Sequence, residues 1–204
     1  MARTRPGLTR DAVLTAALGI IDESGLEGCT MRAVAAELGV EAMSLYWHVR
    51  GKEALLDGVV ERMLGEVAAE HRDEHPDWRR LLEDFGHAYH RVLLRHPNAI
   101  HLISGRSVGA YIAASKMAET GLTTLEDGGF DRASAIRAVR TVTRFVLGFA
   151  LLEVSTSAPQ PLALSDAPAL GDIVDAVLSD DQEELFRFGL DALIDGFEAK
   201  LRRA

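Results

Sequence analysis

The sequence of 204 residues predicts an all-α protein, and three features support that prediction. Apolar residues recur at spacings of three and four along most of the chain, which is the period of a helix with one buried face. Apolar and polar residues do not alternate over any useful length, so strands are not expected. Glycines, prolines and capping residues interrupt the periodic segments at intervals typical of helix ends. Together these breaks predict about nine to ten helices.

The N-terminal part of the chain predicts three helices followed by a fourth, longer one. Thr9 is the expected N-cap of the first helix and Gly25 its expected end. Gly39 separates the second helix from the third. The four helices are expected over residues 9–24, 30–38, 42–48 and 52–69.

A polar run at residues 71–76 ends in a proline, which can begin a new helix but cannot continue the old one. Residues 155–172 contain three prolines and many small residues, and are predicted to form a loop. The helices expected after the polar run cover residues 78–95, 99–103, 107–127, 131–153 and 180–202. The predicted domains are residues 1–65 and residues 66–204.

The composition excludes several classes of protein. Hydrophobic residues make up 48% and charged residues 26%, which is typical of globular rather than disordered chains. The longest apolar run, residues 145–152, is too short to span a bilayer, and residues 1–6 do not lead into the apolar stretch of a secretory signal. The single cysteine, Cys29, cannot form an internal disulfide, so a cytoplasmic location is expected.

The formal net charge of −9 argues against a large electropositive surface. Its distribution weakens that objection, because residues 1–65 hold seven basic and nine acidic side chains and residues 66–204 hold fifteen and twenty-two. No acidic residue lies between positions 42 and 52. A small basic footprint, doubled by dimerisation, therefore remains compatible with nucleic-acid binding.

Residues 30–48 have the features of a helix-turn-helix. Ala35 is small, so the third helix can approach the second closely, and Gly39 accepts the left-handed conformation of the turn. The third helix would enter a major groove, where its N-terminal side chains meet base edges and its hydroxyl and imidazole groups meet phosphates. The predicted DNA-binding residues are Arg32, Ala42, Met43, Ser44, Tyr46, Trp47, His48 and Lys52.

Three of these residues have individual interpretations. Lys52 begins the next helix, where its ammonium and the free backbone N–H groups together favour a phosphate. Tyr46 and Trp47 could instead be core residues of a small helical domain. Phosphate contact is the favoured interpretation for Tyr46, whereas core packing and DNA contact fit Trp47 equally well.

Residues 8–64 resemble the TetR (tetracycline repressor-like) family of transcriptional regulators. The matching segments are Ala12 to Gly25, Gly28 to Ala35, Leu38-Gly39-Val40, and Leu45-Tyr46-Trp47-His48-Val49 through Lys52 to Asp57. The resemblance implies that positions 32, 42–44, 46–48 and 52 face DNA. Drug-resistance repressors of this family carry a base-reading glutamine where this chain has Ala42, so a different operator is expected. Ala42 and Met43 can only make apolar contacts, for example with a thymine methyl group.

Residues 76–204 show a weaker resemblance to the regulatory domain of tetracycline repressors. In that family this domain binds an effector between helices and dimerises through a four-helix bundle, which implies a bundle of the helices over residues 131–153 and 180–202. The predicted effector-binding residues combine aromatic faces with a few polar groups: Phe85, His87, Tyr89, His101, Arg106, Ile112, Phe145 and Phe149. The final helix also presents a wide apolar stripe that a homodimer would use: Leu185, Leu190, Leu193, Ile194, Phe197 and Leu201.

The residues do not favour a metal or another cofactor. Tetracycline repressors hold a drug–magnesium complex with a histidine, an arginine and a glutamate. Here His101 precedes Arg106 by one residue more than in the family pattern, and Glu153 lies one position later than the family glutamate. The histidine pairs 71/75 and 87/90 lack further ligands nearby.

The function expected from these features is that of a homodimeric, cytoplasmic repressor that releases double-stranded operator DNA when a small hydrophobic or aromatic effector binds. Two alternatives stay open: a helical enzyme and a helical interaction protein that retains a helix-turn-helix fold. The sequence lacks a nucleophile elbow, a phosphate loop and an H-E-x-x-H motif, so no enzymatic activity is predicted.

Overall fold

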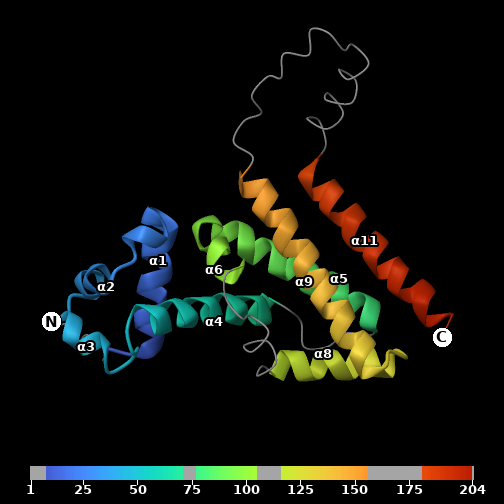
Figure 1. Cartoon of the computed structure of the whole chain (residues 1–204), viewed down its shortest axis with the longest axis horizontal. Coiled ribbons are helices and arrows are strands. Elements are labelled where there is room, and N and C mark those ends of the chain that lie inside the picture. Colours follow the sequence, from blue (N-terminus) through green and yellow to red (C-terminus); the bar gives the residue numbers. More distant parts are fainter. Residues whose placement is uncertain (1–7, 71–76, 105–115, 156–180, 204) are drawn as a thin grey trace, which may run out of the picture. The chain divides into compact units, whose positions relative to one another are not determined.

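The computed structural model describes residues 8–70, 77–104, 116–155 and 181–203. Every regular element in these ranges is a helix, which confirms the predicted all-α class. The helices, labelled in Figure 1, are α1 (Arg10–Gly28), α2 (Met31–Leu38), α3 (Ala42–Leu45), α4 (Lys52–Glu70), α5 (Trp78–Arg95), the 3-10 turn η1 (Pro97–Ala99), α6 (Ile100–Ser104), α8 (Lys116–Asp127), α9 (Arg132–Ser155) and α11 (Gln182–Leu201). Among the described helices, none is long and apolar enough to cross a membrane.

The chain divides into two compact units, and two of the described helices, α5 and α8, contribute residues to both. The first unit comprises the described residues within 1–73 and 91–120, and the second those within 74–90 and 121–204. The helix α5 therefore begins in the second unit and ends in the first. The predicted boundary between residues 65 and 66 separates a DNA-binding domain from an effector-binding domain rather than two compact units, and it stays a prediction.

Local hydrogen bonds explain where the first helices begin and end. The hydroxyl oxygens of Thr9 and Thr30 each accept a hydrogen bond at 3.1 Å from a backbone N–H three residues later, so Thr9 is the N-cap as predicted and Thr30 caps α2 in the same way. Gly39 has φ 65°, and this left-handed conformation ends α2. Gly25 also has a positive φ, 72°, but there the helix is only interrupted, and it continues for one more short turn to Gly28.

The third helix is shorter than predicted. We expected it to cover residues 42–48, but α3 ends at Leu45, and Tyr46, Trp47 and His48 lie in turns. The backbone N–H of Tyr46 donates to the carbonyl of Met43 at 3.3 Å and that of His48 to the carbonyl of Leu45 at 2.9 Å, so tighter i to i+3 bonds follow the end of α3. The three side chains are therefore placed by a turn rather than by a regular helix.

The core of the first unit forms where α1 crosses α4. Val13, Ala17 and Ile21 on α1 are fully buried, as are Leu55, Val59 and Met63 on α4. A Cβ atom at Gly58 would lie only 2.4 Å from Cδ2 of Leu14. Glycine at position 58 therefore allows the backbones of the two helices to approach closely.

The second unit packs the N-terminal part of α5 with α9 and α11, and α9 and α11 lie side by side and antiparallel (Figure 1). Two glycines make the contacts close, since a Cβ at Gly86 would lie 2.8 Å from Leu190 and one at Gly189 would lie 2.5 Å from Phe145. Asp131 accepts from the backbone N–H of Ser134 at 2.9 Å and caps α9. The predicted helix over residues 107–127 is described only as α8. Of the predicted loop over residues 155–172, Ser155 ends α9 and the remainder lies outside the described ranges.

Candidate DNA interface and effector region

The eight predicted DNA-binding residues all lie on or near the surface of the first unit, over α2, α3 and the start of α4. Trp47 is 90% exposed, Met43 71% and Tyr46 49%. The other five are exposed or partly exposed: Arg32, Ala42, Ser44, His48 and Lys52. The core interpretation of Trp47 is therefore wrong, because a buried tryptophan would lose most of its accessible surface.

Two buried side chains hold this surface in place. Leu45 is fully buried and Val49 is 4% exposed, so the segment is anchored on both sides of the exposed Tyr46 and Trp47. This alternation leaves the aromatic side chains outside while the backbone stays fixed to the core. The arrangement suits recognition, since the contacting groups are presented on a rigid support.

The only cysteine of the sequence does not provide a reactive group beside this surface. Cys29 is fully buried and lies two residues before α2 in the sequence. Burial raises the pKa of its thiol, and the nearby ammonium of Lys52 lowers that pKa by a smaller amount. The thiol is therefore protonated at neutral pH and a poor nucleophile.

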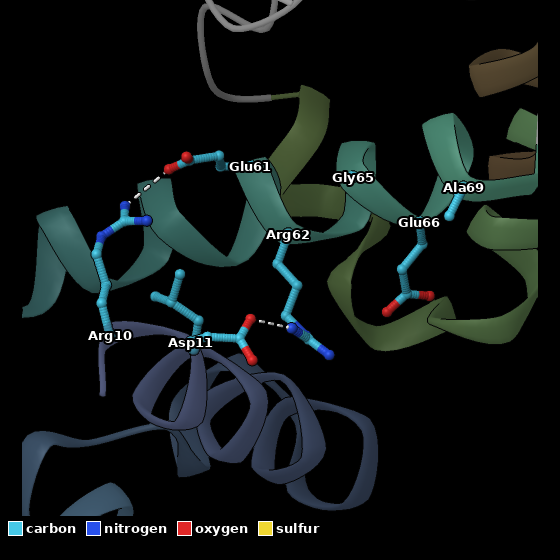
Figure 2. A pocket seen from close by; sticks show the side chains of 8 residues that line it. Arg10, Asp11, Glu61, Arg62, Gly65, Glu66 and Ala69 are labelled. Atoms are coloured by element: carbon cyan, nitrogen blue, oxygen red, sulfur yellow. Dashed lines mark hydrogen bonds and ion pairs between the residues drawn. The ribbon is translucent and has the colours of Figure 1, made fainter. Parts of the chain in front are cut away.

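A groove between α1 and α4 is closed by ion pairs that the sequence did not predict. Figure 2 shows Arg10 reaching Glu61 across the groove and Arg62 reaching Asp11, with N···O distances of 2.7 Å and 2.5 Å. Each pair joins residues 51 positions apart, so neither follows a helical spacing. These charges are paired with one another and align α4 on α1.

The predicted effector residues fall into separate places. Phe85 and Tyr89 are buried on α5 and stack with ring centroids 5.9 Å apart. The hydroxyl of Tyr89 is buried and has no hydrogen-bond partner among the described residues, and burial raises its pKa. His101 is exposed on α6 in the first unit, whereas Arg106 and Ile112 lie outside the described residues.

The other three predicted residues gather around one aromatic ring that sequence reasoning missed. Phe186 on α11 is fully buried. Its ring centroid lies 5.4 Å from that of His87, 5.7 Å from that of Phe145 and 5.3 Å from that of Phe149. The signal was present, because Phe186 precedes Leu190 and Ile194 by four and eight residues on the apolar stripe of the last helix.

A histidine–carboxylate pair lies in the same aromatic cluster. The imidazole of His90 stacks on Phe186 with centroids 4.0 Å apart, and its Nε2 lies 2.8 Å from Oε2 of Glu153. The carboxylate of Glu153 is thus engaged with a residue of its own chain. Across the described ranges, no group of three or more His, Cys, Asp or Glu side chains is arranged to hold a metal ion, and the pair 71/75 lies outside them.

The predicted dimerisation stripe is divided between core and surface. Leu190 and Ile194 are fully buried inside the unit, while Leu185 is exposed and Leu193, Phe197 and Leu201 are partly exposed. Two other apolar side chains are far more exposed: Leu152 on α9 at 73% and Phe188 on α11 at 72%. Sequence periodicity alone could not separate these two groups, because each helix of a bundle carries apolar residues on more than one face.

Comparisons with known protein families match both parts of the chain. Residues 13–59 match the family described as bacterial regulatory proteins, tetR family. Residues 72–201 match the family described as tetracyclin repressor-like, C-terminal domain. The second match alone spans more than half of the sequence.

Individual relatives and solved structures agree with these matches. The class D tetracycline repressor protein of Escherichia coli is 33% identical over 95% of this chain and 91% of that protein. The HTH-type transcriptional repressor DrrR1 of Streptomyces coeruleorubidus is 33% identical over 95% of this chain and 78% of that protein.

Two crystal structures of ligand complexes have the same fold. A TetR variant of Acinetobacter baumannii AYE in complex with minocycline superposes with a TM-score of 0.80, at 31% identity over 94% of each chain. ActR of Streptomyces coelicolor in complex with actinorhodin gives a TM-score of 0.77, at 26% identity over 96% of this chain and 99% of that chain. The chain therefore belongs to the tetR family of bacterial regulatory proteins and is a ligand-responsive transcriptional repressor.

Proposed function

We propose that this repressor binds double-stranded operator DNA through the surface formed by α2, α3, the following turn and the start of α4. The observation that supports this proposal most strongly is Trp47, which is 90% exposed between the buried Leu45 and Val49. A large aromatic side chain held in solvent on a fixed backbone is available for contact with a macromolecule. Residues 1–65 would thus form the DNA-binding domain and residues 66–204 the effector-binding and dimerisation domain.

The individual side chains of this surface have chemically distinct roles in the proposal. Arg32 and Lys52 carry the positive charges that phosphates attract, and Ser44, Tyr46 and His48 offer hydrogen-bonding groups. Ala42 and Met43 make apolar contacts with base edges, such as the methyl group of thymine. Trp47, on the exposed side of the turn, contacts the DNA as well.

We propose that the repressor acts as a homodimer, since one short recognition segment reads only one half-site. The exposed apolar side chains of α9 and α11, Leu152, Leu185 and Phe188, support this proposal, because large apolar side chains in water often mark a protein–protein contact. A regulator of chromosomal genes acts where the chromosome lies, so the proposed location is the cytoplasm. Its curated relatives are named as repressors, and no enzymatic activity is proposed.

The proposed effector is a small hydrophobic or aromatic molecule. Phe85 and Tyr89 on α5 and Phe145 and Phe149 on α9 provide aromatic faces, and the unpartnered hydroxyl of Tyr89 provides a hydrogen-bonding group. Similar proteins crystallised with minocycline and with actinorhodin support an aromatic ligand.

In the proposed mechanism the effector shifts a population of conformations. It binds best to a form in which the two recognition surfaces of the dimer no longer match the two half-sites, so the operator is released. The helix α4 is the proposed lever, because it begins at Lys52 in the DNA-binding surface and extends to Glu70.

A DNA-binding measurement with matched variants tests the first part of the proposal. The probe is a fluorescently labelled fragment from beside the gene of this protein, measured by anisotropy at low salt. Trp47→Ala and Lys52→Ala should each weaken binding at least about tenfold, whereas Lys200→Ala removes an exposed ammonium of α11 and should leave it unchanged. Equal effects of the two lysine variants, or no binding by the unaltered protein, would contradict the proposal and favour an interaction protein without DNA affinity.

A thermal-shift screen tests the effector proposal. Minocycline with Mg²⁺ and actinorhodin are the first probes, followed by other aromatic compounds. A bound effector should raise the melting temperature and release the labelled DNA, since binding to the folded state stabilises it. Phe149→Ala should reduce both effects. If the variant keeps the full thermal shift and the full release of DNA, Phe149 is not part of the effector site.

A further inference from the structure

His96 links three helical elements of the first unit through its two ring nitrogens. It lies between α5 and η1, and its side chain is only 9% exposed. Nδ1 lies 2.8 Å from Oδ2 of Asp22 on α1, and Nε2 lies 3.1 Å from Oε2 of Glu66 on α4. One buried ring thus joins α1, α4 and the end of α5.

The two contacts require a particular protonation state. An ionised carboxylate can only accept hydrogen bonds, so each ring nitrogen must donate one, and only the imidazolium ion carries a proton on both nitrogens. The two carboxylates balance the buried positive charge. A neutral ring would turn one lone pair toward a carboxylate oxygen, and that contact would become repulsive.

The neighbouring charges reinforce the contact on the α4 side. Arg95 donates to Glu66 at 3.0 Å and also to Glu70, and Arg91 donates to Glu70 at 3.1 Å. Burial raises the pKa of Glu66, but the combined hydrogen bonds and charges of His96 and Arg95 lower it below its ordinary value. Glu66 is therefore ionised at neutral pH and remains a pure acceptor.

The same helix also connects this cluster to the proposed effector region. The helix α5 carries Phe85 and Tyr89 in the second unit and Arg91 and Arg95 in the first, and His96 follows directly at its end. Lengthening the 3.1 Å contact between Nε2 and Glu66 by about 0.5 Å would take it beyond hydrogen-bonding distance. The cluster can therefore respond to small displacements of α5.

We propose that His96 is a positioning residue whose doubly protonated ring holds α4 against α1 in the operator-binding form, so that operator affinity depends on the protonation of this ring. The inference rests on the proposed function, because α4 is the lever that positions the DNA-binding surface. It adds a proton-sensitive control at a residue outside both the DNA-binding and the effector-binding sets.

Asp22→Asn separates the protonation requirement from the contact itself. An amide at this position can donate to Nδ1, so a neutral ring that keeps its proton on Nε2 still satisfies both contacts. The matched control is Glu23→Gln, which removes an exposed carboxylate from the adjacent position of α1. Both variants change the charge of α1 equally.

The first measurement is the affinity for the labelled DNA fragment at pH 6.0 and pH 8.0 and constant ionic strength. The unaltered protein and Glu23→Gln should lose about fivefold to tenfold more affinity over this interval than Asp22→Asn, which corresponds to one hydrogen bond. Circular dichroism and melting temperature confirm that all three proteins are folded. The same pH dependence in Asp22→Asn and Glu23→Gln would overturn the inference.

The second measurement observes the ring directly and does not need DNA. Nitrogen-15 NMR of the histidine side chains, assigned with His96→Gln, should show both ring nitrogens of His96 protonated at pH 6.5, and a neutral tautomer in Asp22→Asn. A neutral ring in the unaltered protein would overturn the inference. If none of the proteins bound DNA, the proposed function would fail together with the predicted effect on affinity, while NMR would still decide whether His96 carries two protons.

Discussion

Tyr89 shows what a single buried polar atom indicates about this repressor. Its ring is stacked on Phe85 and almost wholly buried, yet its hydroxyl has no hydrogen-bond partner within the described ranges of the chain. An unpartnered buried hydroxyl destabilises a fold unless another molecule satisfies it. Its position on α5 makes an effector the natural partner in our proposal.

Removal of that hydroxyl should stabilise the effector-free protein. Tyr89→Phe should increase the free energy of unfolding by about 1 kcal/mol, because the penalty for an unsatisfied group disappears while the ring stays. Urea denaturation measures this difference, with Tyr46→Phe as a control at an exposed hydroxyl. A decrease in stability would mean that the Tyr89 hydroxyl has a partner in solution.

At the scale of the element, α4 combines two kinds of restraint. Gly58 lets it approach α1 closely, and acidic residues in its last turns hold the arginines of α5. The first restraint is steric and independent of pH, whereas the second depends on ionised carboxylates. The two can therefore be tested separately.

Two glycine-to-alanine substitutions should change the free energy of unfolding in opposite directions. Gly58→Ala should lower the free energy of unfolding by about 1–3 kcal/mol, because its Cβ would clash with Leu14. Gly19→Ala, at an exposed position of α1 with open space around it, should raise stability by about 0.5–1 kcal/mol through helix propensity. Denaturant unfolding measures both, and a neutral Gly58→Ala would contradict the close crossing of α1 and α4.

The acidic residues of α4 should make stability depend on pH at the acid end. Hydrogen bonds from Arg95 and Arg91 lower the pKa of Glu70 below its ordinary value of 4.5, despite a smaller opposing effect of burial. The unfolded chain then binds more protons than the folded one below about pH 4.5, so the contribution of Glu70 is present above that pH and lost as the pH falls. Glu70→Gln should therefore flatten the acid limb of the melting temperature, while Glu23→Gln should not.

At the scale of the whole molecule, the exposed apolar side chains of α9 and α11 favour self-association. Phe188 and Leu152 are both more than 70% exposed, although they lie on helices whose other apolar residues form the core of the second unit. This surface is a better indicator of the dimer contact than the fully buried Leu190 and Ile194.

Phe188→Glu should convert the repressor to a monomer, because the new carboxylate would be buried without a partner in the dimer. Analytical ultracentrifugation measures the mass, and the labelled DNA fragment should bind at least about tenfold more weakly, since a monomer contacts only one half-site. Gln182→Glu adds the same charge at an exposed position of α11 and should leave the mass unchanged. A dimeric Phe188→Glu would place the interface elsewhere.

Local features of the sequence determined much of this protein. The helical period, the threonine at position 9 and the glycine at position 39 act within a few residues of the chain, so they predicted the start of α1 and the end of α2 correctly, whereas α1 continues past its predicted end at Gly25 to Gly28. The eight predicted DNA-binding residues are exposed or partly exposed, as expected. These properties depend on backbone hydrogen bonds and steric limits that neighbours in sequence decide.

Other properties were decided only by tertiary structure. Periodicity assigned Leu185 and Leu190 to one apolar stripe, but tertiary packing determined that Leu185 is exposed and Leu190 is fully buried. The contacts of His96 with Asp22 and Glu66 join residues 74 and 30 positions away, which no local pattern encodes. Burial and ion pairing depend on which helices meet, and that meeting is a property of the folded chain as a whole.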